Sequence, residues 1–371
     1  MMKNSGSSNK GFLRVFTKSA LVLVNVIAIV PLLVGVCANY LSPTHYTTVF
    51  AFVGMLFPLW VALNVLFVLF WIVAHRWSFL LSFVALLCCG ASVRNTFPVH
   101  LTRAKNAGGN DTLCVISYNV AQFNYEKEPR ALQLVLEHDP DVVCLQEYAE
   151  SGNSKYVTAA DISKTMKRYP YRYNTFKWTN RYGTRFGIVT FSKYPIIRYR
   201  DLSFESKGNG GHVLDLLVGG DTLRLINIHL ESFSLSKQDL GQIDGALDNP
   251  TSSESVRKAG ETVRNTMPKR MRSRAKQAEI IAAEVKDSPY KTIVCGDFND
   301  TPVSYTYHTI RGSMLDAHVE ADWGLGNTYF HKGIGICIDH LLYTPDIHAD
   351  KFNVIDSDAS DHRPIRATLS W

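Results

Sequence analysis

The sequence predicts an α/β domain preceded by a helical membrane region, and two observations support this. Residues 1–97 are dominated by long apolar runs, whereas residues 107–371 alternate short apolar segments with helical and polar ones. In the later part, several short apolar segments stop abruptly at a polar side chain, as strands do when their ends carry chemistry. The overall 46% hydrophobic content and mean hydropathy of -0.03 average these two unlike regions.

Three apolar runs predict three transmembrane helices within residues 1–97. The runs are Ser19–Leu41, Tyr46–Ala74 and Trp77–Val93. The third would span about 26 Å at 1.5 Å per residue, slightly less than a bilayer core of about 30 Å. A cleaved signal peptide is the alternative for the first run, because Val36-Cys37-Ala38 resembles a cleavage site. The other two runs anchor the chain in either case.

The basic N-terminus predicts the orientation. Lys3, Lys10, Arg14 and Lys18 precede the first run without an acidic residue, which favours the cytoplasmic side. Three spans then place everything after residue 97 outside the cytoplasm, so the sequence predicts an integral protein of the cell or inner membrane with an extracytoplasmic domain. The basic residues after the third run argue against this orientation; they are Arg94, Arg103 and Lys105.

A polar linker over residues 98–111 is predicted to lead into a soluble domain over residues 112–371. Its expected strands are Leu113–Tyr118, Asp141–Leu145, Tyr171–Phe176, Phe186–Phe191, His212–Val218, Leu223–Ile228, Thr292–Cys295, Cys337–Tyr343 and Pro364–Trp371. Its expected helices are Pro129–Glu137, Arg274–Val285 and Ser304–Arg311. Lys237–Arg274 reads as a long surface loop with helical pieces.

One stretch, Ile293–Pro302, organises the domain. Its buried strand ends at Gly296, after which Asp297 and Asn299 are spaced i, i+2 and point the same way along an extended backbone. A carboxylate and an amide directed into one small volume suit a hard divalent cation or a phosphate. An Asx-turn that only closes the strand is the alternative.

Charge and cysteine content restrict the function classes. The net charge of +6 is mild; it fits an anionic ligand or a membrane surface and does not require nucleic acid. None of the seven cysteines has the spacing of a zinc site, so packing explains them better than metal binding.

Polar residues recur at the ends of apolar segments. The motifs are Ser117-Tyr118-Asn119, Leu145-Gln146-Glu147, Asn227-Ile228-His229, Gly296-Asp297-Phe298-Asn299, Ile338-Asp339-His340 and Ser360-Asp361-His362. Any one of them alone would be an ordinary turn or a solvated side chain. Together they indicate an active site, because carboxylates and amides hold Mg²⁺ and histidines carry protons near neutral pH.

In order and spacing these motifs resemble those of the endonuclease/exonuclease/phosphatase superfamily, the DNase I-like fold, over about residues 110–371. The resemblance implies a four-layer α/β sandwich of two mostly antiparallel sheets flanked by helices. It also implies hydrolysis of a phosphoester by metal-assisted attack of water. For the metal it implies Glu147 as the main ligand, Asn119 beside it and Asp361 nearby, with Mg²⁺ as the cofactor and Mn²⁺ as the other possibility.

The resemblance implies roles for five further residues. Asp297 and Asn299 would position the attacking water and the phosphate. His362, oriented by Asp339, would act as a base or a phosphate contact. His229 matches a second histidine of DNase-like and sphingomyelinase-like members.

The position that supports the second histidine in nucleases of the family differs here. It carries a glutamate in those nucleases and Thr184 in this chain, so a general-acid role for His229 is open. The neighbouring Arg185 is either a phosphate contact or an exposed strand-start arginine.

The substrate remains open between a lipid headgroup and a nucleic acid, with the membrane tether favouring a membrane-proximal phosphodiester. Gly333–Ile338 lacks the tryptophan motif of the inositol-phosphatase branch, which disfavours that branch. The basic cluster Lys269–Arg274 could touch headgroups or a nucleic-acid backbone, or could simply be solvated. The alternatives are a phosphomonoesterase and a catalytically silent, membrane-tethered binding module on the same fold.

Overall fold

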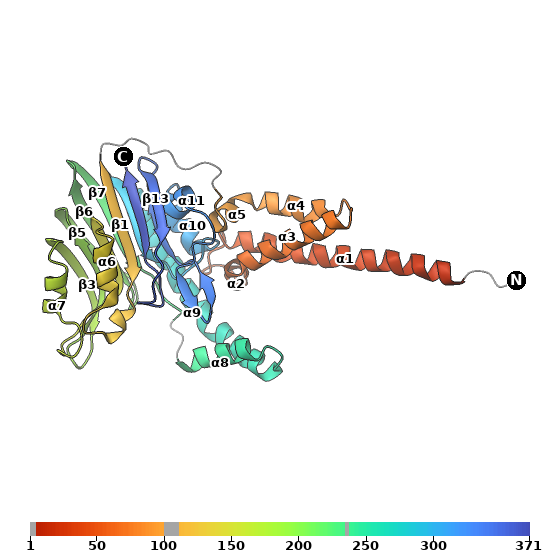
Figure 1. Ribbon diagram of the computed structural model, residues 1–371, viewed down its shortest axis with the longest axis horizontal. Helices are drawn as coiled ribbons and strands as arrows, with labels where there is room; N and C mark the ends of the chain where they lie inside the picture. Colours follow the sequence, from red (N-terminus) through yellow and green to blue (C-terminus); the bar gives the residue numbers. More distant parts are fainter. Residues whose placement is uncertain (1–4, 100–110, 234–236) are drawn as a thin grey trace.

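The computed structural model describes residues 5–99, 111–233 and 237–371 (Figure 1). Most of the predicted linker therefore lies outside the described residues, as does Lys3. Figure 1 shows two sheets with their helices at one end of the molecule and a helical bundle at the other, with the first turns of the bundle's longest helix farthest from the sheets.

Two mixed six-stranded sheets form the C-terminal domain. The first sheet has the order β13 (His348–Val354), β14 (Ile365–Ser370), β1 (Thr112–Asn119), β2 (Val142–Glu150), β4 (Arg185–Ser192) and β3 (Tyr171–Thr179). The second has the order β5 (Ile196–Leu202), β6 (Gly210–Val218), β7 (Asp221–His229), β8 (Lys291–Asp297), β12 (Asp339–Tyr343) and β9 (Leu315–Asp316). In each sheet one central pair is parallel, β1 with β2 and β7 with β8, and the other pairs are antiparallel.

Helices and a short hairpin complete the domain. They are the left-handed turn η1 (Ala121–Tyr125), α6 (Arg130–Glu137), α7 (Ala159–Thr165), α8 (Lys237–Asp248), α9 (Ser253–Lys286), α10 (Tyr305–Arg311), α11 (Ala317–Ala321), β10 (Tyr329–His331) and β11 (Ile334–Ile336). The prediction of a long loop with helical pieces over Lys237–Arg274 underestimated the helix, because α8 and α9 occupy almost all of it. Strong local signals explain α9: Ser252 accepts a capping hydrogen bond from the Ser255 amide, and an apolar stripe packs against the second sheet.

The core lies mainly between the sheets. Apolar side chains from both inner faces meet there, and a separate apolar cluster joins the outer face of each sheet to its helices. A chain of buried polar groups crosses the same interface. Gln146 Nε2 donates to Asn227 Oδ1 (2.8 Å), and Asn227 Nδ2 donates to Thr190 Oγ1 (3.1 Å). The His212 ring then joins Thr190 Oγ1 (2.8 Å from Nε2) to Thr175 Oγ1 (3.0 Å from Nδ1). We call these five residues the polar ribbon.

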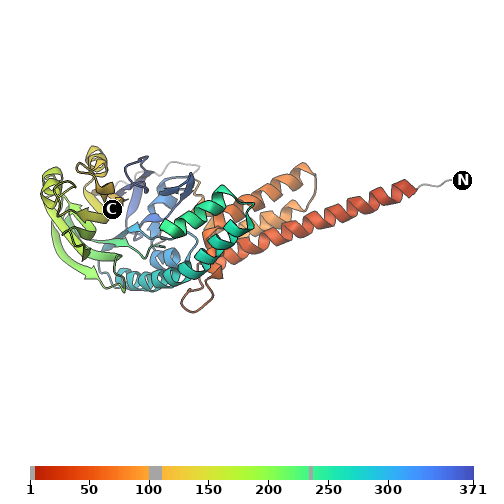
Figure 2. The ribbon, with the colours of Figure 1, turned by 90° about the horizontal axis from the view of Figure 1, so that it is seen from below.

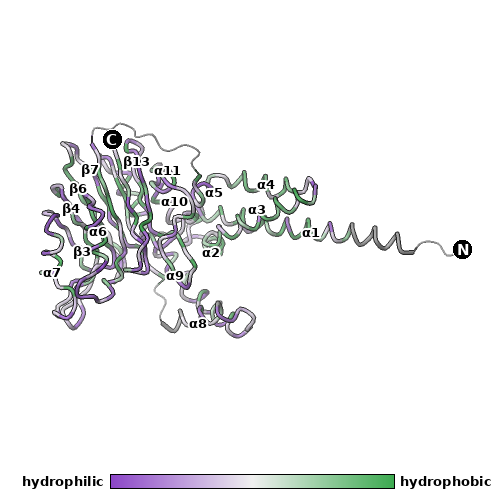
Figure 3. The backbone as a smooth tube through the Cα atoms, viewed as in Figure 1, coloured by the Kyte–Doolittle hydropathy of each residue, from purple (hydrophilic) through white to green (hydrophobic). Residues whose placement is uncertain are grey.

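The N-terminal region is a helical bundle of α1 (Ser5–Cys37), α2 (Val49–Met55), α3 (Phe57–Val73), α4 (Phe79–Cys88) and α5 (Gly90–Thr96), and Figure 3 shows its apolar character. Of the described helices, one is long and apolar enough to cross a membrane, over Phe16–Cys37 with a hydropathy of 2.8. The second and third predicted spans are each broken into two helices, by bends of 62° and 77°. They add two crossings only if each bent pair counts as one span.

Buried amides join the bundle helices. Asn25 donates to Ser82 Oγ (2.6 Å) and accepts from Trp71 Nε1 (2.9 Å), while Ser82 donates to Asn64 Oδ1 (2.8 Å). Polar groups in an apolar bundle hold helices together because each would otherwise lack a partner. The Asn25 and Asn64 interruptions of the apolar runs are therefore structural contacts between helices.

The domain and the bundle interlock at Val303. This residue is buried with the bundle side chains Leu32, Phe57 and Val61. Its carbonyl oxygen would lie 2.6 Å from a Cβ at Gly54, so only glycine lets the loop approach the bundle so closely. The loop after β8 thus packs into the helical bundle.

Candidate active site

The candidate residues converge because the two parallel strand pairs end at the same edge of the sandwich. Asn119 and His229 are the last residues of β1 and β7, and Asp297 is the last residue of β8. His229 and Asp297 lie in register across the parallel pair, and Asp339 faces Asp297 from antiparallel β12. Strand topology alone therefore brings side chains from distant parts of the sequence into one place.

Backbone geometry at the end of β8 depends on Gly296. This glycine has φ 142°, and a Cβ there would lie 1.9 Å from the Ile228 carbonyl oxygen, so no larger residue fits. Beyond it, the Asn299 amide donates to Asp297 Oδ1 (2.8 Å) and the Asn299 side chain donates to the Leu230 carbonyl (3.1 Å). The Asx-turn does form here, and it fixes the carboxylate within the site.

A bulge aims Glu147 into the site. The register between β2 and β4 shifts between Leu145 and Tyr148, and Glu147 has φ 48°, a conformation uncommon for a residue with a side chain. Its side chain is 33% exposed, whereas the Asp297 side chain is 1% exposed. Glu147 is thus the carboxylate most accessible to a cation arriving from solvent.

Asn119 lies between the two carboxylates. Its Nδ2 donates to Asp297 Oδ2 (3.0 Å) and Glu147 Oε1 (3.3 Å), while its Oδ1 accepts from the Ala121 amide (3.1 Å). In this arrangement its nitrogen, which does not bind metals, faces the site. Asn119 thus contacts both Glu147 and Asp297, and its role as a metal ligand stays a prediction.

Asp297, Asp339 and His362 form a compact buried cluster whose ligand atoms lie within 4.8 Å of one another. His362 Nδ1 is 2.9 Å from Asp339 Oδ2, and His362 Nε2 is 3.8 Å from Asp297 Oδ2. Burial alone would lower the pKa of His362, but the two carboxylates outweigh it and raise that pKa to about 10. Burial and the neighbouring Asp339 charge raise the pKa of Asp297.

His229 faces the same carboxylates. Its Nε2 lies 3.6 Å from Asp297 Oδ2, 3.8 Å from Glu147 Oε1 and 3.3 Å from Asn209 Nδ2. Asn209 also donates to the Leu230 carbonyl (2.7 Å), which holds its amide in place. Asn209 was not predicted, since it precedes β6 without a strand-end motif. Its contact supplies a polar neighbour for His229 in a chain that has Thr184 where nucleases of the family carry a glutamate.

Of the predicted residues, the cluster holds Asp297, Asp339 and His362; Glu147, the predicted main metal ligand, lies beside it, and Arg185 and Asp361 lie farther out. Arg185 forms an ion pair with the buried Glu150 and stacks on Phe176 at 4.4 Å, so its guanidinium is already engaged. Asp361 is exposed, and its carboxylate accepts from Ser360 Oγ (3.3 Å). Neither belongs to the group that could hold a metal among the described residues.

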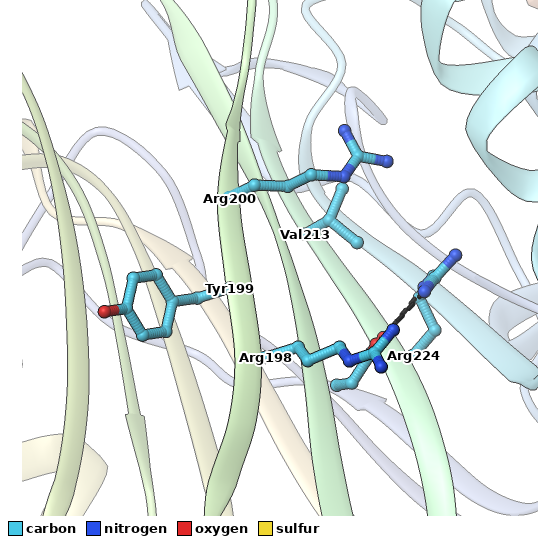
Figure 4. Close-up of a pocket in the computed structure, with 6 residues that line it drawn as sticks. Arg198, Tyr199, Arg200, Val213 and Arg224 are labelled. Carbon is cyan, nitrogen blue, oxygen red and sulfur yellow. Dashed lines mark hydrogen bonds and ion pairs between the residues drawn. The ribbon is translucent and has the colours of Figure 1, made fainter.

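An open cleft of about 170 Å³ gives access to the site. Its lining residues are Gln122, Glu147, Trp178, Phe186, Gly187, Gly208, Asn209, His229 and Ser232. Trp178 and Phe186 stack at 4.0 Å and form a flat apolar wall beside Glu147 and His229. A larger cavity of about 410 Å³ lies on the outer face of β5, β6 and β7, near Arg198, Arg200 and Arg224 (Figure 4). No predicted site residue lines it, so we assign the chemistry to the smaller cleft.

Two arginines from α9 hold the loops of the site, and sequence patterns did not identify them. Arg274 is completely buried; it donates to the Glu231 carbonyl (2.8 Å) and approaches Asp300 Oδ2 (3.3 Å). Arg270 forms an ion pair with the Glu231 carboxylate. Glu231 follows His229 by two residues and Asp300 follows Asn299 directly, so α9 fixes both loops. The signal was present in the predicted basic cluster, but only the fold shows which members point inward.

The donor set fits a hard divalent cation. The groups that converge are carboxylates with nearby amides, and the buried Asp339 Oδ1 has no hydrogen-bond partner among the described residues. The two carboxylates and the histidine of the cluster could together hold a metal ion.

Comparisons with known proteins agree with this geometry. A sequence profile of the Endonuclease/Exonuclease/phosphatase family matches residues 116–362. A second profile, a domain of unknown function called DUF8431, matches residues 18–96. No curated protein matches the sequence.

Solved structures share the fold at low sequence identity. An endonuclease/exonuclease/phosphatase from Beutenbergia cavernae is 16% identical with a TM-score of 0.50, covering 70% of this chain and 72% of its own. Truncated TDP2 from Caenorhabditis elegans is 18% identical with a TM-score of 0.47, covering 70% and 98%. A mannosyl-6-phosphatase from Bacteroides thetaiotaomicron is 16% identical with a TM-score of 0.47, covering 70% and 100%.

Proposed function

This chain belongs to the endonuclease/exonuclease/phosphatase family, and we propose that it is a Mg²⁺-dependent phosphodiesterase held at a membrane by its N-terminal helices. The observation that carries the proposal is the buried cluster of Asp297, Asp339 and His362, next to Glu147 and His229. Buried carboxylates crowded together cost stability, so a binding module has no physical reason to keep them. A hydrolase uses them to bind a cation and move protons.

Glu147 would be the principal metal ligand in this proposal. When bound, Mg²⁺ or Mn²⁺ would polarise the phosphate and stabilise negative charge that develops on its oxygens. Asn119 holds Glu147 and Asp297 apart through its amide nitrogen. Asp361 would contribute from the rim, through solvent, since its carboxylate is exposed.

Asp297 would orient the attacking water and accept its proton. The raised pKa of its carboxyl, caused by burial and by Asp339, makes it a better proton acceptor near neutral pH. Asn299 keeps this carboxylate in place through its backbone amide. His362, whose pKa is raised to about 10, is protonated at neutral pH and would donate from Nε2 to a phosphate oxygen.

His229 would be a second phosphate contact. It is buried beside the carboxylates and lines the open cleft. Arg185 would act only if the phosphate displaced part of its ion pair with Glu150. The apolar wall of Trp178 and Phe186 supports a diester, because one ester group could lie against it while the other leaves.

The membrane arrangement follows from α1. The apolar segment Phe16–Cys37 has 22 residues and spans about 33 Å, enough for a bilayer core of about 30 Å. The two-sheet domain lies at the C-terminal end of α1, opposite to where the helix begins (Figure 1). We therefore propose a cytoplasmic N-terminus, two further crossings made by the bent helix pairs, and an extracytoplasmic domain. The proposed division is 1–97, 98–111 and 112–371.

The test uses purified full-length protein in detergent. We expect hydrolysis of bis(p-nitrophenyl) phosphate that EDTA abolishes and that Mg²⁺ or Mn²⁺ restores. Glu147→Gln should lose most of this activity, whereas the matched control Glu128→Gln, an exposed glutamate, should keep it. Full activity in EDTA would contradict the metal role. Faster hydrolysis of p-nitrophenyl phosphate would instead indicate a monoesterase, and no metal-dependent hydrolysis of either would indicate a silent binding module.

A further inference from the structure

The basic segment of α9 faces two ways. Residues 262–278 contain six lysines or arginines and no acidic residue. Arg270 and Arg274 point inward to Glu231 and Asp300, as described above. The other four are exposed, and we call them the basic stripe: Arg264, Lys269, Arg272 and Lys276.

The stripe occupies one side of the helix. At about 100° per residue, its four members fall within an arc of about 140°. The buried residues Ala278 and Ile281 lie on the other side and pack against the second sheet. Among the described residues, Arg264, Lys269 and Lys276 form no ion pair, whereas Arg257 and Lys258 one or two turns earlier are neutralised by Glu261 and Glu254. The stripe is therefore an uncompensated positive surface.

The stripe meets the bundle where a bilayer surface would lie. Arg272 Nε donates to the carbonyl of Pro43 (3.2 Å), in the loop between α1 and α2. This loop follows directly on the apolar segment that ends at Cys37. It also carries Tyr40, 65% exposed, and Tyr46, 53% exposed, which are side chains typical of a membrane interface. In Figure 2, α9 runs from the sheets toward the domain-proximal end of the bundle, and Figure 1 shows its N-terminal half projecting with α8 below that end.

We propose that the basic stripe binds the headgroups of anionic phospholipids at the membrane surface. The inference rests on the membrane-held phosphodiesterase proposed above. Lysine and arginine side chains near an anionic leaflet are attracted to its charge, so four of them beside the proposed transmembrane anchor form an effective contact. The occupant is a lipid and not a nucleic acid, because the stripe is continuous with the rim of the bundle and short of flat aromatic side chains.

This contact also has a consequence for the active site. Arg270 and Arg274 belong to the same helical turns as the stripe and hold the loops of His229 and Asn299. Anionic headgroups on the outer face of α9 would thus fix the helix against the membrane while its inner face fixes the site. The stripe would orient the cleft relative to the bilayer surface.

The experiment measures thermal unfolding of the full-length protein in detergent micelles. The probes are phosphatidylglycerol, phosphatidylcholine and a 20-nucleotide single-stranded DNA, each titrated separately. The variants are Arg264→Gln/Lys269→Gln/Lys276→Gln and the charge-matched control Lys155→Gln/Lys164→Gln/Lys167→Gln, whose lysines are exposed on and around α7, far from the bundle. The expected result is a Tm raised by about 4 °C with phosphatidylglycerol near saturation for wild type and control. The stripe variant should lose most of this gain, and 0.5 M NaCl should reduce it.

Three results would overturn the proposal. An equal gain with phosphatidylcholine would show that charge plays no part. An equal gain in the stripe variant would place the lipid elsewhere. A stripe-dependent gain with DNA but not with lipid would make the stripe a nucleic-acid surface. Hydrolysis of bis(p-nitrophenyl) phosphate is measured on the same samples, so a missing activity with an intact lipid effect would count against the proposed function alone.

Discussion

The two sheets share a strand pattern but differ in what their parallel pairs carry. In the first sheet, β1 and β2 end at Asn119 and at the bulged Glu147, whose carboxylate is accessible. In the second, β7 and β8 end at His229 and at Asp297, both buried. Parallel strand pairs with the same arrangement therefore place one carboxylate, Glu147, within reach of solvent and the other, Asp297, in the interior. In the proposed mechanism, β2 of the first sheet would supply the cation's ligand through Glu147, and β8 of the second would supply the proton acceptor through Asp297.

The largest effect should come from replacing one carboxylate of each sheet by its amide, in two separate variants. Asp297→Asn should lower turnover by at least about 10³-fold, because the second sheet then lacks its proton acceptor. Glu147→Gln should lose activity that high Mn²⁺ partly restores, because it weakens metal binding only. Turnover is measured from 0.1 to 50 mM metal, with thermal unfolding as a folding control. If high Mn²⁺ restored the turnover of both variants equally, Glu147 and Asp297 would not have the different roles proposed for them.

A somewhat smaller loss should follow removal of the imidazole. His362→Ala should lower turnover by about 10²–10⁴-fold, and Asp339→Asn by less, since the ring stays but loses its 2.9 Å partner. His229→Ala should be the mildest of the three. The comparison is made by initial rates on one diester. Near wild-type rates for His362→Ala would exclude this imidazole as the phosphate contact.

The inward-facing and outward-facing basic residues of α9 should contribute differently to the stability of the protein. Arg274→Ala removes a fully buried partner of Glu231 and Asp300, both beside second-sheet residues, and should destabilise the protein by about 3–5 kcal/mol. The exposed Lys276→Ala, one half-turn away, should change stability by less than about 0.5 kcal/mol. Chemical unfolding monitors both. Equal effects would mean that α9 does not hold the second-sheet loops.

The smallest effect should come from the polar ribbon that joins the sheets. Burial lowers the pKa of His212 to about 3, below its usual value of about 6.5. Between these values the unfolded chain binds a proton that the folded one does not, so stability falls as pH falls. From pH 7 to pH 5 the loss should be about 2 kcal/mol from this group.

Chemical unfolding of wild type and His212→Gln across this pH range checks the effect. The variant should lack this part of the pH dependence. If both proteins lose stability equally between pH 7 and pH 5, His212 must also take up a proton in the folded protein. That result would mean that water reaches the polar ribbon.

Much of the site could be predicted because strand-end residues are readable from local pattern. The termini of the apolar runs gave Asn119, Glu147, His229, Asp297 and Asp339 together, and the fold then required them to meet. The contacts made by Asn209 and Arg274 could not be predicted, because each depends on a partner that is distant in sequence. Glu147 was found, but the bulge that exposes it depends on pairing with β4.

Helices and strands were predicted less well from the sequence where the local patterns were weak. β5 was missed because its middle carries exposed Arg198, Tyr199 and Arg200, so it lacks an apolar face of its own. The polar surface of α9 suggested a loop, although its buried stripe makes it a helix. In the bundle, hydropathy alone did not show that the second and third apolar runs bend.

Because Val303 packs among the bundle helices, we expect the loop after β8 to become ordered only after those helices have assembled. Val303 lies four residues after Asn299 in the chain, and its apolar surroundings come from the helices that bury it. Before those helices assemble, this loop has no surface on which to settle, so we expect a newly made domain to remain idle until the bundle has formed in the bilayer. A fragment lacking the bundle would be a poor enzyme for the same reason. Hydrolytic activity in cells would then report completed insertion of the chain.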